Sequence, residues 1–146
     1  MSRSLRVANG GSIRRTRLLS FSFNGTLYSG FEGDTLASAL LANNVRTVHR
    51  SFKYHRPRGL LCVGGNCPNC LMNVDGVPNV RVCMEPVSDG MVVHHQNAWP
   101  SLNHDIMAFL DKLDRFLPVG FYYKSLIRPK WLWHVVEPLI RRVAGL

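Results

Sequence analysis

The sequence predicts an α+β fold, in which a β-rich domain with one packed helix is followed by a helical extension. Two patterns predict it. Apolar and polar residues alternate with a period of two over residues 18–23 and 80–84, which is typical of half-buried strands. After Trp99-Pro100 the apolar residues recur at helical spacing instead. We therefore expect three parts: a basic, mobile N-terminal segment (1–17), a β-rich domain (18–99) and a helical, aromatic-rich extension (100–146).

A β-hairpin is predicted at the start of the β-rich domain. Leu19, Phe21 and Phe23 alternate with serines and lead into Asn24-Gly25, the pair favoured in two-residue hairpin turns. Residues 26–31 can return as the second strand. Later strands are expected over 71–74, 80–84 and 91–94, with Asp75-Gly76 as a turn after the first of them.

One helix is predicted between the hairpin and the later strands. Its apolar stripe consists of Leu36, Ala37, Leu40 and Leu41. Asp34 is the expected N-cap, and Asn43 and Asn44 suit the end of the helix.

Two further helical stretches are predicted in the extension. The first carries an apolar stripe that begins at Leu102 and ends at Phe116, with Ser101 as its expected N-cap and Pro118 as its stop. The second covers residues 130–143, and Pro138 should kink it.

Length and composition narrow the class of protein. A chain of 146 residues favours one domain, or a small domain with an extension. The N-terminus lacks the apolar region of a secretory signal, and the sequence has no apolar stretch long enough to cross a membrane. We therefore expect a cytoplasmic protein, in which closely spaced thiols more often bind metal or perform redox chemistry than form disulfides.

The cysteines have the spacing C-x4-C-x2-C-x12-C. They are Cys62, Cys67, Cys70 and Cys83. The first three match the plant-type ferredoxin loop, whose fourth ligand comes from elsewhere in the chain. Two irons bridged by two sulfides need four thiolates, and we expect Cys83 to supply the last one from a strand.

Two glycines lie inside the cysteine loop. Gly64 and Gly65 can adopt unusual backbone angles and let amide N–H groups approach the sulfides of a cluster. The preferred occupant of the loop is therefore a [2Fe–2S] cluster.

Other occupants of the four thiols stay open at this point. A structural zinc site usually uses two short chelate pairs, whereas only Cys67 and Cys70 form one here. Two disulfides would need an oxidising compartment, and Cys67-Pro-Asn-Cys70 could act as a redox-active thiol pair. His94 and His95 could offer a Rieske-type ligand, although four cysteines make one unnecessary.

Residues 35–74 contain no acidic side chain, and formal net charge is +9. The basic side chains just before the cysteines would partly offset the negative charge of a cluster, or would dock an acidic face of a partner. An arginine of this run could instead pair with a buried carboxylate of the same chain. The residues expected to bind a partner or tune the cluster are Arg50, Lys53, Arg56 and Arg58.

Two stretches resemble a known family. "FEGDTLASALLANNVRTVHRSFKYHRPRG" resembles the N-terminal region of the α subunit of heteromeric sarcosine oxidase. The cysteine loop resembles the small [2Fe–2S] subunits of FAD-dependent amino-acid dehydrogenases such as hydrogen cyanide synthase and opine oxidase. The resemblance covers about residues 18–146, because the tail from Asn97 is also similar to the longer α subunits.

The resemblance implies a ferredoxin-like β-grasp fold and membership of a flavoprotein complex. In such a complex an FAD-containing subunit oxidises an amino acid or amine, and electrons pass singly through the cluster to another flavin or an external acceptor. The chain has no G-x-G-x-x-G fingerprint, so FAD is expected on partner subunits and the isolated chain should show no turnover. It would be either a complete small subunit or the N-terminal fragment of a larger flavoprotein subunit.

Rival functions come from other classes. A structural zinc module or a nucleic-acid-binding module would also be basic, but no nucleic-acid motif is present. The aromatic, basic tail "VGFYYKSLIRPKWLWHVV" is expected to contact another subunit, with core packing or contact with the inner face of a membrane as alternatives. The substrate, electron acceptor, reduction potential and stoichiometry do not follow from the sequence.

Overall fold

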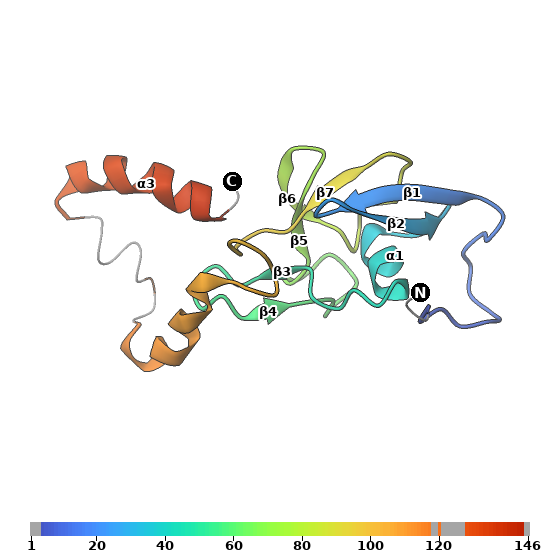
Figure 1. The fold of residues 1–146 in the computed structure, drawn as a ribbon, viewed down its shortest axis with the longest axis horizontal. Coiled ribbons are helices and arrows are strands. Elements are labelled where there is room, and N and C mark those ends of the chain that lie inside the picture. The colour runs from blue at the N-terminus through green and yellow to red at the C-terminus, as the bar shows by residue number, and fades with distance from the viewer. Residues whose placement is uncertain (1–3, 118–119, 121–127, 145–146) are drawn as a thin grey trace.

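A computed structural model of the chain describes residues 4–117, residue 120 and residues 128–144. Its centre is a five-stranded mixed sheet of order β2-β1-β7-β5-β6, in which only β1 and β7 pair in parallel. Helix α1 packs on this sheet, as in the ferredoxin-like β-grasp fold (Figure 1). The elements are β1 (Leu18–Phe23), β2 (Thr26–Phe31), α1 (Leu36–Ala42), β5 (Leu71–Val74), β6 (Val77–Arg81) and β7 (Val92–His94).

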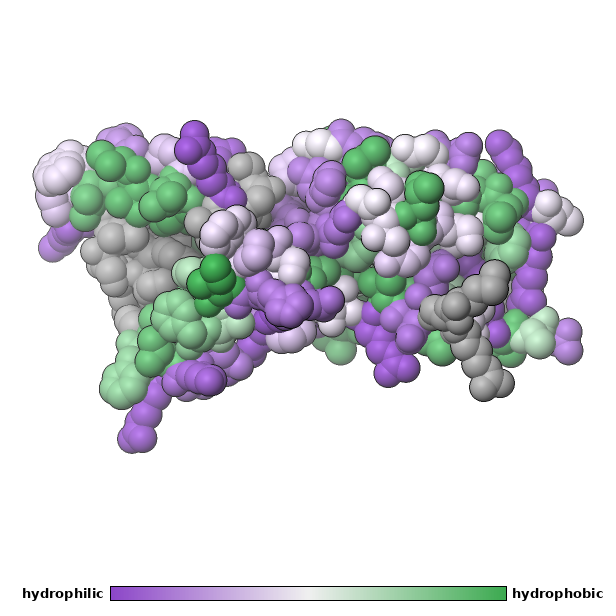
Figure 2. Space-filling view, viewed as in Figure 1, coloured by the Kyte–Doolittle hydropathy of each residue, from purple (hydrophilic) through white to green (hydrophobic). Residues whose placement is uncertain are grey.

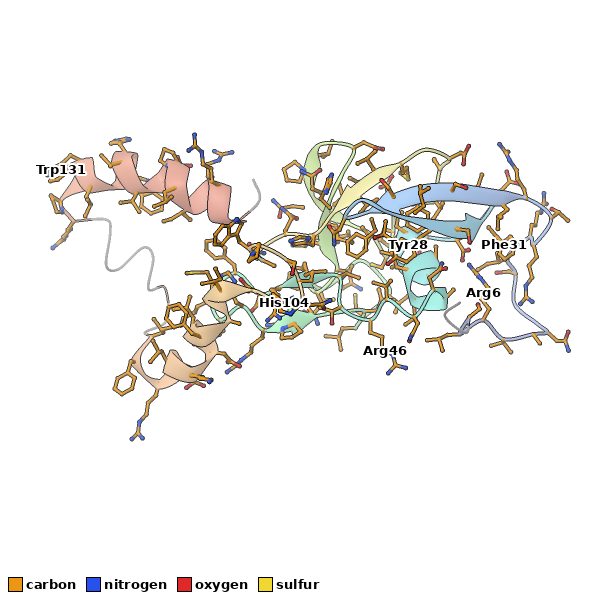
Figure 3. The ribbon with its side chains drawn as sticks, viewed as in Figure 1. Arg6, Tyr28, Phe31, Arg46, His104 and Trp131 are labelled. Atoms are coloured by element: carbon orange, nitrogen blue, oxygen red, sulfur yellow. The ribbon has the colours of Figure 1, made fainter. Side chains whose placement is uncertain are left out.

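The predicted hairpin is confirmed. β1 and β2 pair in register from Leu18–Phe31 to Phe23–Thr26. Asn24 and Gly25 both have left-handed backbone angles, with φ of 51° and 80°, as a two-residue hairpin turn requires. The inward side chains of β1 are buried, and Tyr28 stacks on Phe21 with ring centroids 6.1 Å apart (Figure 3).

Helix α1 begins one residue later than predicted. Its N-cap is Thr35, whose hydroxyl accepts the Ser38 N–H while the Ser38 hydroxyl accepts the Thr35 N–H. The prediction of Asp34 was wrong because the Asp34 carboxylate bonds other groups, namely the Phe31 N–H, the Ser38 hydroxyl and the Arg6 guanidinium. Asn43 is the C-cap, as predicted.

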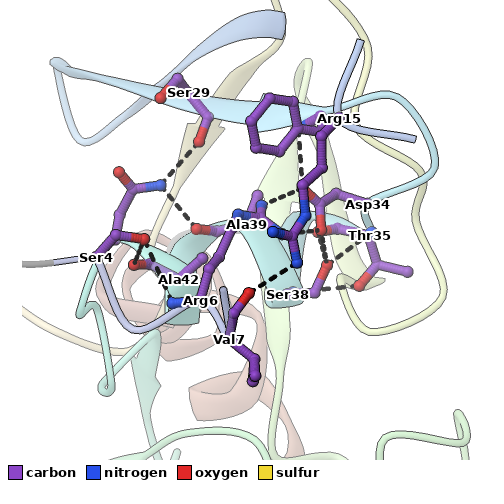
Figure 4. Close-up of polar contacts among 12 residues, drawn as sticks. Ser4, Arg6, Val7, Arg15, Ser29, Asp34, Thr35, Ser38, Ala39 and Ala42 are labelled. Carbon is purple, nitrogen blue, oxygen red and sulfur yellow. Dashed lines mark hydrogen bonds and ion pairs between the residues drawn. The ribbon is translucent and has the colours of Figure 1, made fainter. Parts of the chain in front are cut away.

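The N-terminal segment has no regular secondary structure in residues 4–17, and two contacts fix its start against α1. The Leu5 N–H donates to the Ala42 carbonyl at 2.9 Å. Arg6 pairs with the buried Asp34 and lies 5.0 Å from the Phe31 ring centroid (Figures 3 and 4). Mobility of the remainder of this segment stays a prediction.

The later strands follow the predicted order, but the strand expected over 80–84 is found at Val77–Arg81. β6 ends at Arg81, so Cys83 lies in a turn and not on a strand as expected. The Met84 N–H closes this turn by donating to the Arg81 carbonyl at 2.8 Å. The turn directs Cys83 back toward Cys70, because the neighbouring Val82 N–H donates to the Cys70 carbonyl at 3.2 Å.

The long basic loop contains a small two-stranded sheet. β3 (His49–Arg50) pairs antiparallel with β4 (Pro57–Arg58). Gly59 follows β4 and packs directly on the backbone of Arg46: a Cβ at this glycine would lie 2.2 Å from the Arg46 carbonyl oxygen. This close approach explains why the loop passes from β4 into the cysteines through a glycine.

The extension is helical, although its first helix differs from the prediction. η1 (Ile106–Phe116) is a 3-10 helix with a kink at Leu113, and its N-cap is Asp105 instead of Ser101. α3 covers Lys130–Ala144 with Pro138 inside it, and it lies apart from the sheet (Figure 1). The predicted stop at Pro118 and part of the aromatic tail fall outside the described residues. None of the helices in the described residues has the length and hydrophobicity of a membrane-spanning segment.

The core lies between α1 and the sheet and includes two of the cysteines. Cys70 is 2% exposed and Cys83 is 3% exposed, among Leu36, Leu40 and Met72. In contrast, apolar side chains gather on the outside of η1 and α3 (Figure 2). The exposed residues there are Ile106, Phe109, Leu113, Phe116, Trp131, Val135 and Leu139.

Candidate metal centre

The four cysteines come from three places around the β5–β6 edge of the sheet. Cys62 is exposed and Cys67 half-buried in the loop that follows β4. Cys70 directly precedes β5, and Cys83 lies in the turn after β6. β5 and β6 pair antiparallel with Leu71 opposite Arg81, so Cys70 and Cys83 lie at the same end of this strand pair.

The thiols interact as two pairs. The Cys62 side chain interacts with Cys67, and the Cys70 side chain interacts with Cys83. The pairs are neighbours, because Cys67 also acts electrostatically on Cys70. A cluster with two irons takes two thiolates on each iron, so a two-plus-two arrangement suits it.

The pairs differ in their proton affinity. The backbone N–H of Gly64 has the largest effect in lowering the pKa of the Cys62 thiol to about 6, and the Cys67 side chain and the N–H groups of Asn66 and Cys67 add to it. Burial, followed by its interaction with Cys83, raises the pKa of Cys70 to about 11. The loop therefore already stabilises negative charge on sulfur at Cys62, which is what a metal-bound thiolate needs.

The two glycines have different structural roles. Gly65 has a left-handed φ of 73°, and a Cβ there would lie 3.0 Å from Cγ of Met84. Gly64 has no such backbone angle, and a Cβ there would make only ordinary van der Waals contacts. The backbone N–H of Gly64 donates to the Cys62 sulfur. The backbone angle expected of both glycines is thus found at Gly65, while Val63 shares it with φ of 52°.

The donor set fits a binuclear cluster better than a single ion. Within the described ranges, no three His, Cys, Asp or Glu side chains are gathered as the ligands of one metal ion would be. A [2Fe–2S] cluster is expected to have four thiolate ligands, amide N–H groups that donate to sulfur, and a loop in which glycine allows close packing. This loop has all three features. His95 is engaged elsewhere, since its ring bonds the Asn24 side chain at 2.8 Å.

Three members of the predicted basic set contact the extension. Arg50 donates to the Leu102 carbonyl at 2.7 and 2.9 Å and lies 3.6 Å from the buried Asp105 carboxylate. The Lys53 ammonium donates to the Leu117 carbonyl at 3.0 Å. Arg56 pairs with Asp111 and Asp114 of η1, and these carboxylates raise its pKa further.

Arg58 is the member that reaches the cysteine loop. Its guanidinium donates to the side-chain oxygen of Asn69 at 3.3 Å, one residue before Cys70. The four basic residues are therefore divided between two tasks: Arg50, Lys53 and Arg56 join the loop to the extension, and Arg58 joins it to the cysteines. Roles in partner binding or cluster tuning stay predictions for all four.

Sequence reasoning missed the burial of three polar side chains, His55, Asp105 and His49. His55 and Asp105 are bonded at 2.7 Å between Nδ1 and Oδ2, and both are buried. His49 is 3% exposed beside Asn69 and lines a cavity of about 210 Å³ with Arg58. The His55–Asp105 pair joins positions fifty residues apart, and His49 is buried against the segment around Asn69, so no local sequence pattern indicates either.

Comparison with known proteins assigns this region to a family. Residues 16–98 match the family described as "2Fe-2S iron-sulfur cluster binding domain". The match covers more than half of the chain and includes all four cysteines.

Individual relatives are much longer than this chain. Over 98% of its length the chain is 49% identical to "Sarcosine oxidase subunit alpha" of Rhizobium meliloti (strain 1021), of which it spans 15%. Over 44% of its length it is 42% identical to "Sarcosine oxidase subunit alpha" of Corynebacterium sp. (strain U-96), of which it spans 7%. The solved structure of L-proline dehydrogenase from P. horikoshii matches 57% of the chain and 16% of its own, with a TM-score of 0.50 and 30% identity.

Proposed function

Because the chain belongs to the family of [2Fe–2S] iron–sulfur cluster binding domains, we propose that Cys62, Cys67, Cys70 and Cys83 hold its cluster. We further propose that the chain is the electron-transfer part of a multi-subunit FAD-dependent amino-acid or amine dehydrogenase. The observation that carries this proposal is the two-plus-two arrangement of the thiols within the matched domain. When bound, the cluster accepts and releases one electron at a time.

The chain's own residues position and tune that group. The loop amides of Gly64, Asn66 and Cys67 donate to the Cys62 sulfur and so stabilise negative charge there. Cys70 and Cys83 fix the other side of the site to the hydrophobic core. Arg58, which bonds Asn69 next to Cys70, would favour the more negative, reduced state of the cluster.

The rest of the complex is proposed from the relatives. FAD would reside on partner subunits, and the electrons would pass from flavin to another flavin or an external acceptor. The names of the relatives support oxidation of an amine or amino acid by the whole complex. We propose a cytoplasmic location, with any membrane contact made through the complex, and no turnover by the isolated chain.

The decisive experiment is iron and sulfide analysis of anaerobically purified protein, with its visible spectrum. We expect about two irons and two sulfides per chain and a brown colour that bleaches on reduction. A colourless protein containing zinc would contradict the proposal.

The ligand assignment is tested at Cys83, the ligand farthest from the others in sequence. C83S should lower iron and sulfide per chain, because it leaves one iron with a single thiolate. M84L, which changes the adjacent exposed side chain, is the control and should retain the cluster. Equal iron content in C83S and M84L would remove Cys83 from the ligand set.

A further inference from the structure

The two cysteine pairs face different surroundings. Cys62 is exposed and Cys67 half-buried, whereas Cys70 and Cys83 are 2% and 3% exposed and belong to the core. Electron transfer between proteins needs a close approach of the two redox groups. The Cys62–Cys67 side is therefore the side from which another protein can approach the centre.

The exposed pair is bordered by apolar side chains. Leu61 is 70% exposed, Val63 is 62% exposed and Met84 is 58% exposed. Leu61 and Val63 flank Cys62, and Met84 packs against the same loop at Gly65. A group of exposed apolar side chains around one functional position is typical of an interaction surface and not of a solvated loop.

Positive side chains predominate near this border, although one carboxylate, Glu85, directly follows Met84. No carboxylate occurs from residue 35 to residue 74, and exposed Arg81 lies at the start of the turn that carries Met84. Arg58 contacts the cysteine loop through the side chain of Asn69. An apolar centre with arginines beside it complements a protein surface that has an apolar patch edged by carboxylates.

We propose that Leu61, Val63 and Met84 form an electron-exit surface that docks an apolar, carboxylate-edged patch on a flavin-bearing partner. The proposal rests on the proposed function and adds to it the route by which electrons leave. A nucleic acid would require basic side chains at the centre of the surface, where this one is apolar. A basic surface can also bind an anionic membrane, and the vesicle experiment below tests for that partner.

The first test concerns exposure and needs no cluster. Cluster-free protein is treated briefly with iodoacetamide, and the four cysteines are followed by mass spectrometry. Cys62 and Cys67 should be modified before Cys70 and Cys83. Equal rates at all four positions would overturn the proposal.

The second test measures the exit of an electron from the cluster-loaded chain. The protein is reduced with dithionite, and its oxidation by ferricyanide is followed by stopped flow; one electron passes from the cluster to each ferricyanide, giving ferrocyanide. L61E should slow this step by about threefold or more at low salt, because the new carboxylate repels the anionic oxidant, and the effect should shrink at high salt.

L27E is the matched control. Leu27 is 78% exposed on β2, at the opposite edge of the sheet from the β5–β6 edge that carries the cysteines. It places the same new charge far from the loop, so its oxidation rate should stay near that of the wild type. Equal rates for L61E and L27E would overturn the proposal.

The outcomes separate this proposal from the proposed function. A chain that carries no bleachable cluster defeats the proposed function. A bleachable cluster whose oxidation ignores L61E defeats the exit surface alone. Co-sedimentation of wild-type protein with phosphatidylserine vesicles, lost in L61E but kept in L27E, would assign the surface to a membrane and also overturn the proposal.

Discussion

Asp34 is a buried carboxylate that joins the N-terminal segment to the fold. It is 1% exposed and receives the Arg6 guanidinium, the Phe31 N–H and the Ser38 hydroxyl (Figure 4). Burial alone would raise its pKa, but these partners together hold the pKa below its ordinary value. A single side chain thus converts a basic, irregular segment into part of the packed structure.

Removing Arg6 should be costly. R6A leaves the Asp34 carboxylate buried without its cation, and we expect it to lower the free energy of unfolding by about 2–4 kcal/mol. R17A breaks the exposed pair of Arg17 with Glu32 and should cost less than about 1 kcal/mol. Urea denaturation of both variants checks this. Equal losses would mean that the buried pair contributes no more than a surface one.

His49 predicts a dependence of stability on pH. Burial lowers the pKa of this imidazole, although nearby backbone groups of Asn69 and Pro68 oppose the shift. Neither ring nitrogen has a well-formed hydrogen bond within the described part of the chain. Because the folded pKa lies below the unfolded value of about 6.5, the unfolded chain binds more protons between the two values. Stability should therefore fall as the pH drops through that window.

The H49F variant should lose part of this acid sensitivity. It keeps the buried volume filled and removes the group that must stay neutral, so unfolding free energy should change less between pH 7.5 and 5.5 than in the wild type. The remainder is expected from His95, whose pKa burial also lowers. H104F, at the exposed histidine in Figure 3, is the control and should behave like the wild type.

At the scale of elements, the basic loop and the extension form one connected unit. Asp105 caps η1 through the Met107 N–H at 3.2 Å and bonds His55 of the loop at 2.7 Å. Arg50 reaches the Leu102 carbonyl from β3. Residues that follow the matched domain (16–98) therefore hold the loop that leads into the cysteines in place.

Removing Asp105 should lower the free energy of unfolding more than removing an exposed ion-pair partner of Arg56. D105A leaves the buried His55 without its carboxylate partner and removes the N-cap of η1. We expect it to lower the free energy of unfolding by about 2–4 kcal/mol. Hydrogen exchange should also accelerate in residues 50–58. D111A removes an exposed partner of Arg56 and should cost less than about 1 kcal/mol. Unchanged exchange in D105A would show that the loop holds its shape without the extension.

The elements that the sequence predicted are those with local signals. Asn24-Gly25 specifies its hairpin, and the stripe of α1 specifies its buried face. Thr35 displaced Asp34 as the cap because Arg6, distant in sequence, claims the carboxylate. In the same way, the pairing of Arg50, Lys53 and Arg56 with the extension depends on tertiary contacts that charge patterning does not reveal.

At the scale of the whole molecule, the outer face of α3 is available to a partner. Trp131, Val135 and Leu139 are four residues apart and all exposed, and Arg141 and Arg142 add positive charge at the end of the helix. We predict that V135E with L139E reduces the FAD that co-purifies with the chain from its native host, while iron content stays unchanged. H134E, at an exposed polar position of α3, is the control. Equal FAD in both would exclude this face from the subunit contact.

Two cysteines of the centre are also members of the hydrophobic core. Cys70 and Cys83 are buried in the same cluster as Met72 and Leu36, while Cys62 is exposed. Iron and sulfide that reach an already folded domain would find only two of the four cysteine ligands accessible. Local opening of the core should therefore limit the rate at which the cluster is inserted. The rate of cluster reconstitution in the folded chain should rise in mild urea and should reach a plateau as the iron concentration increases. A chain that is still folding should accept the cluster faster than the folded chain.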